Sequence, residues 1–212
     1  GTIRLAAMQD ENSLNYETQI MYRDDDDSEW REIDRFEGFG NGWFDIGFTE
    51  DNSKLYVTSN LGQDTYTISL FDPETGMMEE VFANEGTDVT SIGFTPTGEP
   101  ITVLYNDINT KPQRHYLNKK WEQTIEGLKA AFDVDYIGIA SMSEYAEKIV
   151  LTISSDTNPG EYYLYDTIKN TVTYLGSTRP WIDPKTMSPM EPISFEARDG
   201  ETIYGFLTVP LD

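Results

Sequence analysis

A short motif returns at nearly constant spacing, and this repeat constrains the fold more than any other feature of the chain. DIGFT at residues 45–49 recurs as SIGFT at 91–95 and, more loosely, as YIGIA at 136–140. The copies are 46 residues (45 to 91) and 45 residues (91 to 136) apart. A fixed period of roughly 40 to 50 residues is typical of propellers and solenoids. The chain is therefore expected to use one structural unit several times.

Each copy of the motif opens a series of strand-like segments. A polar turn follows each copy and leads into a second apolar run, at residues 54–58, 101–105 and 148–153. A third, alternating segment ends in a turn at 70–76, and again 94 residues later at 164–170. Fourth strands are expected at 78–82 and 171–175. Four antiparallel strands in about 45 residues describe one blade of a β-propeller.

These units predict an all-β fold, a β-propeller of about four blades with four antiparallel strands each and one short inserted helix. A first, less regular copy is formed by the segments 3–8, 18–23 and 30–36. The expected blades cover residues 1–40, 41–86, 87–133 and 134–178. A linker over residues 179–192 and a final segment, 193–212, are expected to follow them.

The inserted helix is predicted in the third unit, where the strand pattern is interrupted after Tyr116. Four apolar residues stand at positions i, i+4, i+7 and i+11, namely Trp121, Ile125, Leu128 and Phe132. This spacing places them on one face of a helix.

The glycines of the repeated motif, Gly47, Gly93 and Gly138, lie on the segments expected to be the innermost blade strands. Glycine in a strand lets a neighbouring backbone approach closely. We expect these glycines to have that structural role around the channel.

Charge restricts the partners of the chain. With 38 acidic and 15 basic residues the net charge is -23, which repels phosphate backbones and anionic lipid headgroups. Nucleic acid is therefore not an expected partner, and no apolar stretch is long enough to span a membrane. The charge is consistent with a solvated surface suited to solubility or a saline habitat, or with attraction of cationic partners or metal ions.

One run of four carboxylates, Asp24, Asp25, Asp26 and Asp27, is the place to look for an ion. It lacks the spaced alternation and the central glycine of a calcium-binding loop, and it lies between two strand-like segments. We predict that it forms the tip of a hairpin.

The residues needed for several kinds of catalysis are missing. There is no G-x-S-x-G elbow, no H-E-x-x-H and no phosphate-binding loop. The single histidine, His115, is predicted in a blade strand, and the glycine-rich residues 38–42 are predicted to form an inter-blade loop. No pair of carboxylates can be nominated in so acidic a chain, and the absence of cysteine rules out disulfides and thiol metal sites. We therefore predict no catalytic, cofactor or metal site residues.

The last hundred residues, from about 115 onward, resemble a known family. Residues 153–166 (ISSDTNPGEYYLYD), then Arg179-Pro180, residues 190–195 (MEPISF) and residues 197–210 (ARDGETIYGFLTVP) are similar to the last propeller blade and the following hairpin of prolyl oligopeptidase family serine peptidases. The similarity is to the bacterial acylaminoacyl-peptidase and dipeptidyl-aminopeptidase branch. The helix from Trp121 resembles one that precedes the final blade in these enzymes.

This resemblance implies a longer parent, in which a propeller caps an α/β-hydrolase domain and restricts access to small peptides. Residues 193–212 would be the first hairpin of that missing domain, and the family's catalytic Ser, Asp and His would lie beyond Asp212. The partners would be that domain and peptide substrates. A periplasmic or secreted parent is favoured over a cytoplasmic one.

One alternative function remains open, and one further prediction concerns self-association. A free-standing propeller would act as a protein-interaction scaffold, although a scaffold has no need of a hydrolase-type hairpin. A partial propeller also exposes unpaired sheet edges, so self-association through them is expected.

Overall fold

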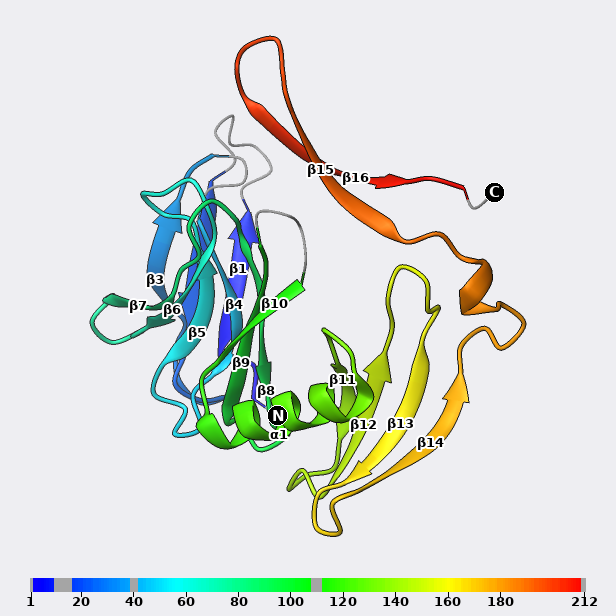
Figure 1. The fold of residues 1–212 in the computed structure, drawn as a ribbon. Coiled ribbons are helices and arrows are strands. Elements are labelled where there is room, and N and C mark those ends of the chain that lie inside the picture. The colour runs from blue at the N-terminus through cyan, green and yellow to red at the C-terminus, as the bar shows by residue number, and fades with distance from the viewer. Residues whose placement is uncertain (1, 10–16, 39–41, 108–111, 211–212) are drawn as a thin grey trace. The chain divides into compact units, whose positions relative to one another are not determined.

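The computed structural model describes residues 2–9, 17–38, 42–107 and 112–210. The chain divides into two compact units, residues 1–91 and 92–212, and each unit is described by itself. Antiparallel strands dominate both units (Figure 1). Among the described residues, no helix has the length and apolar character needed to cross a membrane.

The first unit contains two antiparallel sheets. The first sheet has the order β1-β2-β3 and the second β4-β5-β6-β7. Their strands are β1 (Leu5–Gln9), β2 (Thr18–Tyr22), β3 (Arg31–Phe36), β4 (Trp43–Phe48), β5 (Leu55–Ser59), β6 (Thr67–Phe71) and β7 (Met78–Phe82).

The chain passes from the first unit to the second within β8 (Val89–Phe94). One sheet has the order β10-β9-β8, the next β11-β12-β13-β14, and a two-stranded hairpin pairs β15 with β16. The remaining elements are β9 (Pro100–Asn106), β10 (Pro112–Tyr116), α1 (Lys119–Phe132), β11 (Gly138–Met142), β12 (Lys148–Ile153), β13 (Glu161–Asp166), β14 (Thr171–Ser177), the 3-10 helix η1 (Pro184–Thr186), β15 (Met190–Glu196) and β16 (Thr202–Thr208).

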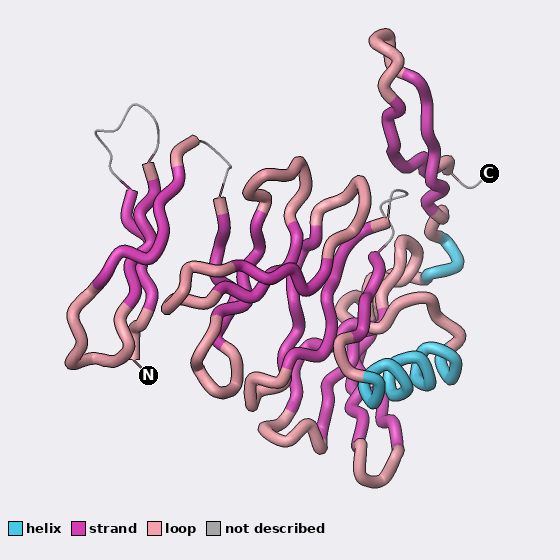
Figure 2. The backbone as a smooth tube through the Cα atoms, turned by 90° about the vertical axis from the view of Figure 1, so that its left-hand side faces the viewer, coloured by secondary structure: helices cyan, strands magenta, loops and turns pink. Residues whose placement is uncertain are grey.

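This arrangement confirms the all-β prediction and the single inserted α-helix, as Figure 2 shows by element type. The predicted fourth strand is present in the sheets β4–β7 and β11–β14. The other two blade-like sheets have three described strands, and in one of them α1 follows β10 in place of a fourth strand. Of the predicted inter-blade loop at 38–42, residues 39–41 lie outside the described part of the chain.

The repeat is visible in the hydrogen bonds of the first turn of three sheets. A hydroxyl residue begins each turn, and its oxygen accepts from the backbone N–H of the first residue after the turn, at 3.0 to 3.1 Å. These residues are Thr49, Thr95 and Ser143. Each turn also contains one residue with positive φ, respectively Asn52 (58°), Gly98 (91°) and Ala146 (54°). Three segments far apart in sequence thus fold by the same local rule.

The left-handed position of this turn yields a paired prediction. A left-handed backbone conformation costs a residue other than glycine about 1–2 kcal/mol, and glycine does not pay this cost. Glycine is, however, more flexible in the unfolded chain, which lowers the stability of the folded protein by about 0.5–1 kcal/mol. Nothing lies within 4 Å of a Cβ built on Gly98, so Gly98→Ala should destabilise the protein by about 1 kcal/mol through backbone strain alone. Ala146→Gly should stabilise it by about 0.5 kcal/mol. Urea unfolding followed by tryptophan fluorescence measures both, and equal signs for the two variants would contradict the argument.

A second turn repeats between the third and fourth strands of two sheets. Asp72 accepts from the backbone N–H of Glu74 at 2.9 Å, and Asp166 accepts from that of Lys169 at 3.0 Å. Asp166 also forms an ion pair with Lys148, its neighbour across the β12–β13 pair. Hydrogen bonding from Lys148 and from the backbone of Lys169 lowers the pKa of the Asp166 carboxyl below its usual value.

The sign of the resulting pH dependence follows from that direction. A carboxyl whose pKa is lowered on folding stabilises the protein fully above its unfolded value of 3.8, and the contribution is lost as the pH falls through the folded value. Asp166→Asn should therefore destabilise the protein by a constant amount at pH 5 to 7. The difference in unfolding free energy between this variant and the unmodified protein should shrink below pH 3.8. Thermal unfolding at several pH values tests this, with Glu144→Gln in an exposed turn as the control.

Two hydrophobic clusters hold the sheets together. In the first unit, buried residues of β2, β4, β5 and β6 form one cluster, consisting of Ile20, Trp43, Leu55, Val57 and Phe71. In the second unit, one face of α1 packs with residues of β9, β12 and β13; this cluster contains Ile101, Trp121, Ile125, Leu128, Ile137, Ile149, Leu151, Ile153 and Tyr165. The predicted apolar face of α1 is confirmed, with Phe132 partly buried beside the same cluster.

Each end of helix α1 is defined by a capping residue. Asn118 caps its N-terminus by accepting from the backbone N–H of Lys120 at 2.8 Å, and Asp133 ends it in a left-handed conformation. Tyr116 of β10 donates a hydrogen bond to Glu126 of the helix at 2.7 Å. Burial, together with this bond, raises the pKa of Tyr116 to about 12.

At two of the three motif glycines, the nearest neighbour of the position where a Cβ would lie is a threonine side chain, and their expected role around the channel stays a prediction. A Cβ on Gly138 would collide with the hydroxyl of Thr152, its partner on β12, and one on Gly93 would lie 3.1 Å from the hydroxyl of Thr102. No described atom lies within 4 Å of a Cβ on Gly47. The nearest atom at two of the three glycines is thus a threonine hydroxyl on the adjacent strand, not another backbone.

Candidate functional site: the exposed hairpin and its anchor

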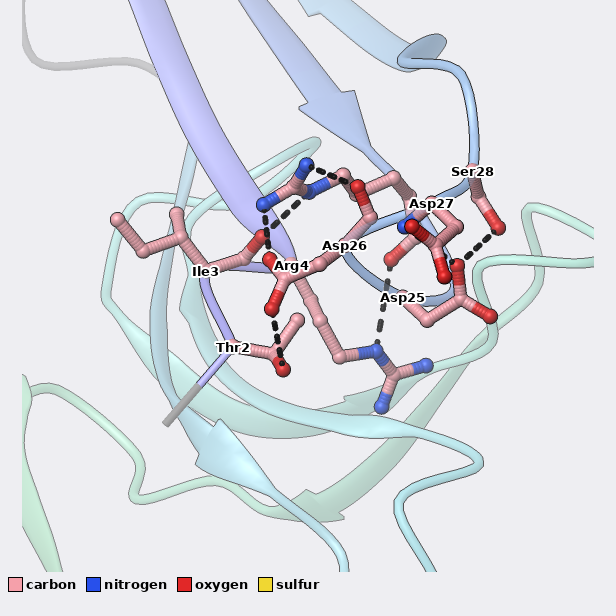
Figure 3. A network of polar contacts seen from close by, with 8 residues as sticks. Thr2, Ile3, Arg4, Asp25, Asp26, Asp27 and Ser28 are labelled. Carbon is pink, nitrogen blue, oxygen red and sulfur yellow. Dashed lines mark hydrogen bonds and ion pairs between the residues drawn. The ribbon is translucent and has the colours of Figure 1, made fainter.

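The aspartate run lies in the turn between β2 and β3, which confirms that it is a hairpin tip (Figure 3). Asp25 accepts from the backbone N–H of Asp27 at 3.0 Å and from the hydroxyl of Ser28 at 2.6 Å. Hydrogen bonding from Ser28 lowers the pKa of Asp25. Asp26 forms an ion pair with Arg23 at 2.5 Å. These carboxylates organise the turn, and within the described ranges no three acidic or histidine residues are grouped to bind a metal.

His115 lies on β10, opposite Val103 of β9, so it is a strand residue as predicted. Its side chain is exposed. The neighbouring Arg114 makes a structural contact instead. Its guanidinium group donates a hydrogen bond to the backbone carbonyl of Ile137 at 2.7 Å. This part of the chain joins two sheets, and the prediction that it holds no catalytic residue stays a prediction.

The most unusual surface of the described chain is the β15–β16 hairpin. Its strands pair in register from Met190 opposite Thr208 to Glu196 opposite Thr202, and nearly all of its residues are exposed. Directly opposed residues share a face of a hairpin. One face, which we call the apolar face, consists of Ile193, Phe195, Ile203 and Leu207 together with Gly205 and Glu191.

The opposite face of the hairpin is mixed. It carries the apolar or aromatic residues Met190, Pro192, Tyr204 and Phe206 but also the polar residues Ser194, Glu196, Thr202 and Thr208. Phe195 on the apolar face is 56% exposed, although aromatic side chains normally supply the largest buried area in a core. An isolated two-stranded hairpin is at best marginally stable in water. The apolar face therefore has the composition of a surface that another structural layer covers.

The hairpin is anchored to the last sheet by the loop between β12 and β13. Asp156 of this loop accepts from the backbone N–H of Met190, the first residue of β15, at 2.5 Å. At the other end of the linker, the backbone N–H of Thr178 donates to the carbonyl oxygen of Gly160 at 2.9 Å. The hydroxyl of Thr178 donates to the carbonyl oxygen of Pro159, also at 2.9 Å. The same loop thus holds both ends of the linker 179–189.

The anchoring loop is ordered by its own side chains. The Ser155 hydroxyl oxygen accepts from the backbone N–H of Thr157 at 3.2 Å and of Asn158 at 3.0 Å, and Asn158 accepts from Gly160 at 3.0 Å. Between loop and linker lies an open cavity of about 280 Å³. Its lining combines loop residues with the linker side chains Arg179, Ile182 and Met187.

Sequence reasoning did not identify Asp156 as the anchor. The residue lies inside the family-like segment 153–166, but a Ser-Asp pair before a Pro-Gly turn indicates only a loop. The partner of Asp156 is 34 residues away in sequence and is a backbone N–H, which leaves no side-chain signature.

Comparisons with known proteins agree with this organisation. No protein-family model matches the sequence. Dipeptidyl aminopeptidase BIII of Pseudoxanthomonas mexicana is 25% identical over 170 residues, which cover 77% of this chain and 24% of that protein. Dipeptidyl peptidase family member 6 of Caenorhabditis elegans is 24% identical over 166 residues, or 78% of this chain and 22% of that protein. The chain thus spans about a quarter of the length of these curated relatives.

Solved structures show the fold. Prolyl oligopeptidase B from Galerina marginata, bound to a 25mer macrocyclization substrate, matches 96% of this chain and 28% of its own with a TM-score of 0.62 and 14% identity. A post-proline cleaving enzyme from Rickettsia typhi matches 98% of this chain and 31% of its own with a TM-score of 0.57 and 13% identity.

The fold and the comparisons together define the class of protein, which is a β-propeller whose blades are sheets of antiparallel strands. Within that class, the chain is similar to the propeller-domain portion of prolyl oligopeptidase family peptidases.

The anchor gives a specific prediction for the hairpin. A single hydrogen bond contributes about 0.5–1.5 kcal/mol, so Asp156→Ala should raise the exchange rate of the Met190 amide at least about twofold. Asp156→Asn retains an acceptor oxygen and should exchange at nearly the original rate. Hydrogen exchange of the hairpin amides measures both variants, and identical exchange in Asp156→Ala and the unmodified protein would show that the contact has no anchoring role.

Proposed function

We propose that the chain is the non-catalytic propeller portion of a serine peptidase, and that it gates and shapes the access of peptides to an α/β-hydrolase domain. The observation that carries this proposal is the apolar face of the β15–β16 hairpin, whose large apolar side chains are exposed. Exposed contiguous apolar surface marks a site that another structure covers. The resemblance to propeller-bearing peptidases supports a hydrolase domain as that cover.

The partners and the environment of the parent follow from this proposal. The hydrolase domain packs on the hairpin, and peptide substrates pass the propeller. Carboxylates that face the channel favour peptides with a free amino terminus, because the chain carries a net charge of -23. A periplasmic or secreted parent is favoured over a cytoplasmic one.

The second candidate is a free-standing propeller that serves as a protein-interaction scaffold. Propellers do act through their surfaces, and the described sheets leave edges that another chain could pair with. The hairpin is the feature that disfavours this reading, since a scaffold gains nothing from an uncovered apolar strand pair.

The deciding experiment is to determine the open reading frame around residues 1–212 and to label its product with a fluorophosphonate probe. A downstream G-x-S-x-G motif followed by Asp and His, with labelling of that serine, supports the peptidase. A frame that encodes no such motif, or a product that is not labelled, overturns it and leaves the scaffold.

The two faces of the hairpin make a sharper test within the full-length protein. Phe195→Asp should reduce peptidase activity or soluble yield at least tenfold, because it removes a large apolar contact and places an unpaired charge under the covering domain. Ser194→Asp adds the same charge on the opposite, mixed face and should change either quantity less than about twofold. Equal effects of the two variants would contradict the assignment of the apolar face to the hydrolase interface.

A further inference from the structure

The cavity between the loop 154–159 and the linker 179–189 has the size of a site for a small ligand. Its volume of about 280 Å³ is close to the lower limit of the range of roughly 300–1,000 Å³ that small-molecule sites occupy. A cavity of this size suits a single amino-acid residue or a compound of similar size, and it is too small for an extended peptide.

The side-chain acceptors of two loop residues in the cavity lining are already occupied. The two carboxylate oxygens of Asp156 accept from the backbone N–H groups of Met190 at 2.5 Å and of Thr157 at 3.0 Å. The hydroxyl oxygen of Ser155 accepts from the backbone N–H groups of Thr157 and Asn158. A ligand that brings hydrogen-bond donors therefore meets acceptors that are already in use.

Several side-chain donors of the same lining are unused. Among the described residues, neither the guanidinium of Arg179 nor the hydroxyl of Ser154 has a hydrogen-bond partner. The side-chain oxygen of Asn158 accepts from the backbone N–H of Gly160 at 3.0 Å, and the side-chain N–H groups of Asn158 have no acceptor within the described ranges. The cavity thus offers donors, one of them permanently charged, and suits a ligand that supplies acceptors.

The unpaired guanidinium of Arg179 is unusual in this acidic chain. Five of the seven arginines donate to a carboxylate or carbonyl oxygen of the protein, namely Arg4, Arg23, Arg31, Arg35 and Arg114. Arg198, in the exposed turn between β15 and β16, also has no acceptor among the described residues, but it is not part of the cavity lining. Arg179 is therefore the arginine best placed to hold an anion from outside the chain.

The rest of the lining selects a carboxylate that is attached to an apolar group. A guanidinium matches a planar carboxylate through two parallel N–H···O bonds. The carboxylate of Asp156 in the same lining and the net charge of -23 disfavour a doubly charged phosphate. Ile182 and Met187 line the cavity from the linker and offer apolar contact to the body of the ligand.

We propose that this cavity binds an apolar carboxylic acid of the size of one residue, such as the C-terminal residue of a peptide, and that Arg179 holds its carboxylate. Ile182 and Met187 contact the apolar part of the ligand. Because the loop also accepts from Met190, a bound ligand joins the loop to the linker and stabilises the anchor of the hairpin. This proposal rests on the cavity of the second unit and does not depend on the proposed peptidase function.

Calorimetric titration of the protein with N-acetyl-leucine, and with N-acetyl-leucinamide as its uncharged counterpart, tests the role of the carboxylate. The acid should bind at least about fivefold more tightly than the amide, because a hydrogen bond to a charged group is strong but weakened by solvent at an exposed site. Arg179→Gln should remove this preference. Arg198→Gln, the same change at an arginine outside the lining, should keep it. Equal binding of acid and amide, an unchanged preference in Arg179→Gln, or no binding of the acid up to roughly 10 mM would overturn the proposal.

Two further measurements test the apolar contact and the position of the ligand. N-acetylglycine lacks the side chain that contacts Ile182 and Met187, so it should bind at least about threefold more weakly than N-acetyl-leucine. Saturating N-acetyl-leucine should slow hydrogen exchange at the Met190 amide and leave the amides of β5, in the first unit, unchanged. Equal binding of the two acids, or unchanged exchange at Met190, would show that the acid does not occupy this cavity.

Discussion

The burial of one apolar sheet face against its neighbour is the interaction on which the rest of the structure depends. A single layer of strands cannot remove its apolar side chains from water, so each sheet needs a second layer. In the first unit the cluster around Trp43 and Phe71, whose ring centres are 4.8 Å apart, meets this need. In the second unit, α1 replaces a fourth strand and contributes Trp121, Ile125 and Leu128 to the core.

Arginines add a second kind of connection between the sheets of this acidic chain. Arg4 donates to the carbonyl of Asn52 at 3.1 Å, and Arg31 donates to that of Pro73 at 2.8 Å. Both guanidinium groups also lie over the ring of the buried Tyr22. Arg114 makes the corresponding link in the second unit. The few basic side chains thus satisfy backbone carbonyls between sheets, while the carboxylates remain mainly in turns and on the surface.

The functional interpretation depends on what is left uncovered after these interactions are made. The sheets bury their shared faces, whereas the hairpin leaves its apolar face exposed and is held by one carboxylate contact. The linker is fixed more firmly at Thr178, where the bonds run to backbone carbonyls, than at Met190, where a single side chain accepts the bond. In the proposed function, the hairpin is the part of the second unit that follows the movement of the covering domain.

The sequence by itself determined the elements that depend on local periodicity. The alternating strands, the helix face from Trp121 and the hairpin tip at Asp24–27 follow from neighbours a few residues apart, and the 46-residue and 45-residue spacings follow from the return of such a local pattern. Only the tertiary structure decided which threonine lies against Gly138 and that Asp156 holds Met190. These contacts join residues distant in the chain, and several use backbone groups that every residue possesses. For that reason no pattern in the sequence predicts these contacts.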